Sequence, residues 1–75
     1  MNELNLLTDV YYYKREQQCW KPSFVISKIK EKNHVVVAAY GPSLPAKHVL
    51  TADEYIDMIR DNQLADYTDK IKDAK

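Results

Sequence analysis

The sequence predicts an α+β domain in which a small, strongly bent antiparallel sheet or barrel of three to five strands is followed by one or two C-terminal helices. A chain of 75 residues can close only one modest core, so we expect a single domain over residues 1–75. Aromatic and β-branched side chains concentrate in residues 9–50, which predicts mainly strands, whereas residues 51–75 predict mainly helix. The charge divides at the same place, with seven basic and four acidic side chains up to residue 50 and four basic and seven acidic side chains after it.

Composition excludes several classes of protein. With 45% hydrophobic and 29% charged residues and a single glycine, the chain is expected to fold rather than remain disordered. The 11 basic and 11 acidic residues balance, so no global charge favours nucleic acid or a membrane. The longest apolar run, residues 35–40, is far shorter than the roughly 20 residues that span a bilayer, and Glu3 stands where a signal peptide would be basic. We expect a soluble protein with no membrane partner.

The single cysteine, Cys19, cannot form an internal disulfide bond. A reducing compartment is therefore the expected location, which means the cytoplasm, or the host cytoplasm if the protein is viral.

Strand-forming residues cluster in several short runs. Polar residues 31–33 predict a tight turn that joins two runs into a hairpin, and the apolar run from residue 34 is typical of a strand buried on both faces. Gly and Pro in residues 41–45 predict an interruption before a brief last strand. The expected strands are residues 9–15, 23–30, 34–40 and 46–50.

The helical part begins with a recognisable N-terminal signal. Thr51 is followed three residues later by Glu54, which predicts a reciprocal capping box. We expect a break or bend at residues 61–63, after which the helical spacing resumes. The apolar face of this helix, expected to be buried, consists of Ala52, Tyr55, Ile56 and Ile59, and the acidic face consists of Asp53, Asp57 and Asp61.

Residues capable of catalysis are few. Cys19, His34 and His48 lie 15 and 14 residues apart, which matches no compact zinc pattern, and no fourth ligand is evident. A glycine-rich phosphate loop is excluded because Gly41 is the only glycine. We therefore expect a protein with no catalytic residues, no metal and no cofactor. The alternative is a small metal-dependent or cysteine-dependent enzyme that uses Cys19, His34 or His48 and completes its site as an oligomer.

Aromatic and basic side chains in the first half form the strongest binding signal. Successive residues of a strand point to opposite faces, so burying one set of the tyrosines leaves the other set at the surface. Exposed aromatics beside cations suit a protein or nucleic-acid partner, whereas the alternative is that these rings close the core of a small barrel.

One stretch resembles a known family. Residues 9–15 (DVYYYKR), Trp20-Lys21-Pro22 before residues 24–26, the strand at 35–40 and the segment at 44–49 resemble the SH3-like barrels at the C-terminus of retroelement integrases. The resemblance implies an SH3-like barrel that binds nucleic acid or proteins without catalysis. The contact residues that it implies are Tyr11, Tyr13, Trp20 and Lys21.

The sequence thus predicts a non-catalytic interaction module that binds a protein partner. Its small size suits a regulatory or inhibitory protein of a virus or mobile element. The expected partner-binding residues are Tyr11, Tyr13, Trp20, Lys21, Asp53, Asp57 and Asp61. The alternative is a nucleic-acid-binding accessory protein. It would use Lys14, Arg15, Lys28, Lys30 and Lys32.

Overall fold

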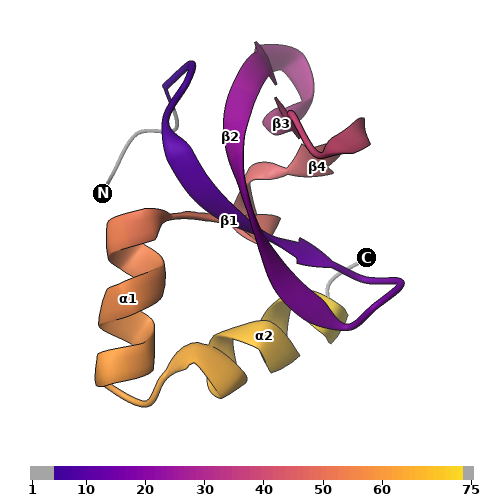
Figure 1. Ribbon diagram of the computed structural model, residues 1–75. Helices are drawn as coiled ribbons and strands as arrows, with labels where there is room; N and C mark the ends of the chain where they lie inside the picture. The colour runs from indigo at the N-terminus through magenta and orange to yellow at the C-terminus, as the bar shows by residue number, and fades with distance from the viewer. Residues whose placement is uncertain (1–4, 74–75) are drawn as a thin grey trace.

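The computed structural model, which describes residues 5–73, contains a five-stranded antiparallel sheet followed by two helices (Figure 1). The strands are β1 (Asp9–Lys14), β2 (Cys19–Ile29), β3 (His34–Val37), β4 (Tyr40–Pro45) and β5 (Val49–Thr51). The helices are α1 (Ala52–Arg60) and α2 (Leu64–Asp73), and two 3₁₀ turns are η1 (Lys30–Lys32) and η2 (Ala46–His48). The predicted α+β class is confirmed.

The sheet is open rather than closed into a barrel. Its strand order is β4-β3-β2-β1-β5, so β4 and β5 are the two edges. The long strand β2 pairs with β1 through its first half and with β3 through its second half. The register shifts between Val25 and Ser27, and a bulge of this kind bends a strand. Of the two predicted forms, the bent sheet is therefore the one that the described residues adopt.

The bend encloses the main hydrophobic core between the two halves of the sheet. Val25 and Val37, which are register partners, are both 0% exposed. The cluster consists of Val10, Tyr12, Val25, Val35, Val37, Leu44 and Val49, with Tyr40 packed against it. All five strands contribute, so the core of this small domain depends on the whole sheet.

Strand β2 begins four residues before the predicted start at residue 23. The added stretch contains Pro22, which lacks an amide hydrogen and cannot donate to a neighbouring strand. In the structure Pro22 lies in the first half of β2, where β1 is the strand that pairs with it, and its register partner is Tyr11. A proline is tolerated there because β3 pairs only with the second half of β2.

The predicted third strand, residues 34–40, is divided in two. Strand β3 ends at Val37, exposed Ala38 and Ala39 form a turn, and Tyr40 begins β4. The expected interruption at residues 41–45 is thus a strand, and it tolerates Gly and Pro because it lies at an edge of the sheet. The expectation that residues 34–40 are buried on both faces is wrong, because Val35 and Val37 are buried while Val36 between them is half-buried.

The start of α1 is confirmed in detail. The Glu54 backbone N–H donates to Thr51 Oγ1 at 3.2 Å, and the Thr51 backbone N–H donates to Glu54 Oε1 at 3.1 Å. The predicted break is also confirmed, because α1 ends at Arg60, Asn62 adopts a left-handed φ of 59°, and α2 begins at Leu64.

Figure 1 shows both helices on one side of β1, with β3 and β4 on the other. Within the described residues, neither helix is long and apolar enough to cross a membrane.

Candidate functional site

The aromatic residues that the sequence assigned to a binding surface pack mainly against the helices. Tyr13 is 3% exposed, and its ring makes an edge contact with Trp20 at a centroid distance of 5.5 Å. Trp20 is half-buried, lies 6.0 Å from Tyr55 and 6.2 Å from Tyr67, and donates from Nε1 to Thr68 Oγ1 at 3.0 Å. We call Tyr11, Tyr13, Trp20, Tyr55 and Tyr67 the aromatic cluster. It is a second packing layer that attaches α1 and α2 to β1 and β2.

This arrangement corrects the expected position of Tyr13, which is buried and so does not form part of the surface. The prediction assumed that one face of β1 is solvated. Instead Tyr12 is 2% exposed in the main core and Tyr13 is 3% exposed against Trp20, so both faces of the strand are covered. Tyr11 and Lys21 are half-buried, and Tyr11 stacks on Tyr55.

Helix α1 presents its isoleucines to solvent. Ile56 is 56% exposed and Ile59 is 54% exposed, whereas Tyr55 on the same helix stacks against the sheet. The predicted burial of Ile56 and Ile59 is therefore wrong. The physical reason is that the helix contacts the sheet near its start, through the stack of Tyr55 on Tyr11, and Ile59 lies one turn further along the same face. Residues three apart on a helix are neighbours, so the two isoleucines form one apolar patch.

The three aspartates of the acidic face are exposed, as their spacing predicts. Arg60 forms an ion pair with Asp57, in which Nη2 lies 2.8 Å from Oδ1. Nε of the same guanidinium lies 3.8 Å from Asp61 Oδ1. All of these side chains are more than half exposed, so the pairs contribute little to stability. We call Ile56, Ile59, Asp53, Asp57 and Asp61 the α1 surface.

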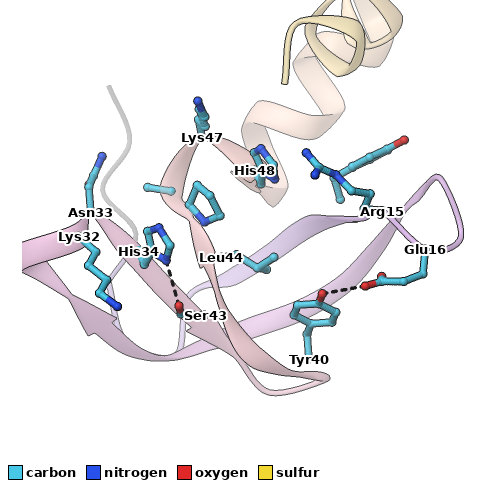
Figure 2. Close-up of a pocket in the computed structure, with 13 residues that line it drawn as sticks. Arg15, Glu16, Lys32, Asn33, His34, Tyr40, Ser43, Leu44, Lys47 and His48 are labelled. Carbon is cyan, nitrogen blue, oxygen red and sulfur yellow. Dashed lines mark hydrogen bonds between the residues drawn. The ribbon is translucent and has the colours of Figure 1, made fainter. Parts of the chain in front are cut away.

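A pocket of about 650 Å³ forms the second candidate site (Figure 2). Its walls come from the turn after β1, from η1 and the start of β3, and from β4 and η2. Five of its side chains are basic residues or histidines, and we call this site the basic pocket. They are Arg15, Lys32, Lys47, His34 and His48.

Hydrogen bonds order two sides of the basic pocket. His34 Nδ1 and Ser43 Oγ share a hydrogen bond of 2.9 Å, and Tyr40 donates its hydroxyl to Glu16 Oε1 at 3.0 Å (Figure 2). A backbone hydrogen bond and the Tyr40 hydroxyl lower the pKa of Glu16. The bond to this carboxylate raises the pKa of Tyr40.

Among the five basic residues and histidines of the basic pocket, His48 is the buried one, at 7% exposure. Burial lowers its pKa, and the positive charges of Arg15 and Lys47 lower it further. Among the described residues, Nε2 of His48 is the one buried side-chain nitrogen or oxygen that has no hydrogen-bond partner.

The residues weighed for metal or cysteine chemistry are only partly brought together. His34 and His48 line the same pocket, but Cys19 does not, and its Sγ lies 3.8 Å from Gln17 Oε1. In the part of the chain that the structure describes, no three His, Cys, Asp or Glu residues are grouped to hold a metal ion. The shared pocket was missed because residues far apart in sequence are juxtaposed only when the sheet bends.

The predicted nucleic-acid set is also divided. Arg15 and Lys32 line the basic pocket, whereas Lys14, Lys28 and Lys30 do not. Lys28 and Lys30 are exposed, and Lys14 is half-buried. Lys47, which completes the cationic lining, was not among the predicted residues; the signal available was its position after Pro45, in the segment that leads to the last strand.

No family model matches this chain, and no curated protein or solved structure matches it. The resemblance to integrase barrels remains a proposal drawn from the sequence pattern. The α1 surface and the basic pocket are the two candidate functional sites of the described residues.

Proposed function

We propose that this chain is a small non-catalytic interaction module that binds a protein partner through the α1 surface. The observation that carries the proposal is the exposure of Ile56 and Ile59, at 56% and 54%, beside the acidic face of the same helix. An amphipathic helix of a small domain usually turns its isoleucines toward the core. Here a partner would complete the burial, because covering apolar area is the main favourable term in association.

The charges of the α1 surface favour a protein over nucleic acid or a membrane. Asp53 makes no ion pair among the described residues, and Arg60 faces two carboxylates, Asp57 and Asp61. This negative surface repels phosphate backbones and anionic lipids. The partner that fits is a protein with an apolar centre bordered by Lys or Arg, which adds electrostatic steering to the contact.

Binding can be tested by comparing two matched variants. The α1 variant carries Ile56→Ser and Ile59→Ser. The control carries Ile26→Ser, because Ile26 is 47% exposed but lies on β2. Each purified protein is immobilised, incubated with an extract of the native host, and the retained proteins are identified by mass spectrometry. Circular dichroism verifies that each variant is folded.

A partner retained by the wild type is then purified and its affinity measured. We expect the α1 variant to bind at least roughly tenfold more weakly, because two partly buried apolar side chains are lost, and the Ile26→Ser control to bind like the wild type. Reversing Asp53 and Asp57 to Lys should lower the association rate. Equal affinity of the wild type and the folded α1 variant would refute the proposal, and a steep loss of binding with salt would favour the nucleic-acid alternative.

A further inference from the structure

The basic pocket carries an excess of positive charge that the described residues do not neutralise. Its cations are Arg15, Lys32 and Lys47, and the ion pairs within residues 5–73 involve none of them. The one carboxylate in the lining, Glu16, accepts a hydrogen bond from Tyr40. When the two histidines are neutral, three cations and one carboxylate give the lining of the pocket a formal charge of about +2.

The cations approach the pocket from separate parts of the chain. Arg15 follows β1, Lys32 lies in η1, and Lys47 lies in η2. They line one pocket because of the tertiary fold and not because of a basic run in the sequence. The volume of about 650 Å³ lies within the range of small-ligand sites, and a concave site suits one compact group better than an extended polymer.

His48 is the buried residue among the basic side chains and histidines of the pocket. Its side chain is more than nine-tenths buried, and the Ile71 backbone acts on its ring. Arg15 and Lys47 both lower the pKa of His48, so their positive potential reaches this buried ring.

We propose that the basic pocket binds the phosphate group of a small ligand through the cationic side chains of its lining, Arg15, Lys32 and Lys47. A phosphate monoester carries nearly two negative charges at neutral pH, which matches the excess charge of the pocket. The guanidinium of Arg15 is suited to bidentate contact with phosphate, and the lysines act as point charges. Such a site uses side chains and needs no glycine-rich loop.

A cation is an unsuitable occupant, because it would meet the charges of Arg15, Lys32 and Lys47. A polynucleotide is disfavoured because the other basic residues of the strands and of η1, Lys14, Lys21, Lys28 and Lys30, lie outside the pocket. This site is separate from the α1 surface, which shares no residue with it.

The test is a titration of the full chain with inorganic phosphate and, separately, pyrophosphate, followed by amide chemical shifts in two-dimensional NMR. Sodium chloride at matched ionic strength is the reference. We expect saturable shifts at Arg15, Lys47 and His48 that chloride does not produce. Arg15→Gln and Lys47→Gln should each weaken phosphate binding roughly tenfold or more, because each removes a charge-assisted contact. Lys28→Gln, an exposed lysine outside the pocket, is the matched control and should bind like the wild type.

Several outcomes would overturn the proposal. They are shifts that do not saturate, shifts that chloride reproduces, or equal weakening by Lys28→Gln. A short oligonucleotide that binds more tightly than pyrophosphate and depends equally on Lys28 and Lys30 would assign the pocket to a nucleic-acid backbone instead. The Ile56→Ser and Ile59→Ser protein should bind phosphate normally, so failure of this proposal and failure of the α1 proposal are distinguishable.

Discussion

The rings of Tyr11 and Tyr55 stack with centroids 3.9 Å apart and an interplanar angle of 11°. Tyr11 lies on β1 and Tyr55 on α1, so the pair fastens the helix to the sheet. Ile59 lies one turn beyond Tyr55 on the same face of α1 and is nevertheless exposed, so only the first part of the helix packs on the sheet. The stack therefore holds the start of α1 to the sheet and leaves Ile56 and Ile59 accessible to a partner.

A double-mutant cycle measures this stack. Tyr11→Leu and Tyr55→Leu should each destabilise the fold, and the coupling between them should be about 1 kcal/mol, because aromatic pairs contribute beyond the area that they bury. Urea denaturation of the two single variants and the double variant gives the coupling. Strictly additive losses would mean that the stacking contributes nothing specific.

The hydrogen bond from Trp20 to Thr68 should stabilise the attachment of α2. Thr68→Val keeps the shape but removes the acceptor, and leaving the part-buried indole N–H unpaired should cost about 1 kcal/mol. Thr68→Ser keeps a hydroxyl and serves as the control. The prediction fails if the two variants have the same denaturation midpoint.

An aspartate should prevent folding at the buried position Val37 and be tolerated at the exposed position Ile59. Val37 is 0% exposed, so Val37→Asp buries an unpaired carboxylate and should abolish cooperative folding. Ile59 is 54% exposed, so Ile59→Asp should stay folded and cost about 1 kcal/mol or less. Thermal denaturation followed by circular dichroism distinguishes them. An unfolded Ile59→Asp protein would place this residue in the core and also undermine the α1 proposal.

His48 should make the fold sensitive to mild acid. Burial, the Arg15 and Lys47 charges and, more weakly, His34 lower its pKa in the folded state, while the Ile71 backbone acts in the opposite direction. The unfolded chain therefore binds more protons at His48 once the pH falls below about 6.5, and stability is lost as the pH falls until the lower folded pKa is reached. Above that window the contribution of His48 is constant.

His48→Gln should reduce this acid sensitivity. Urea midpoints measured at several pH values from 7.5 downward test it, and the slope between pH 6.5 and the carboxylate range should be shallower in the variant. Glu16, whose pKa is lowered from 4.5, loses its contribution only at lower pH and so lies outside the window. Identical pH profiles for both proteins would contradict the assignment.

Local features of the chain were predictable because short-range physics determines them. The capping box of Thr51 and Glu54 requires residues three apart, and the break near Asn62 reflects a residue that tolerates a positive φ. The starts of β1 and β3 follow from runs of strand formers. The class of fold follows from the change of composition at residue 50.

Tertiary structure decided which side chains are exposed and which meet. Tyr13 is buried and Ile56 exposed, against the expected pattern, because burial depends on what lies across from a residue and not on its own periodicity. The histidines at 34 and 48 share a pocket because the sheet bends and η2 returns toward β3. The sequence by itself therefore determined the elements and their local ends, and the packing of α1 on Tyr11 and the bend in β2 decided both candidate sites.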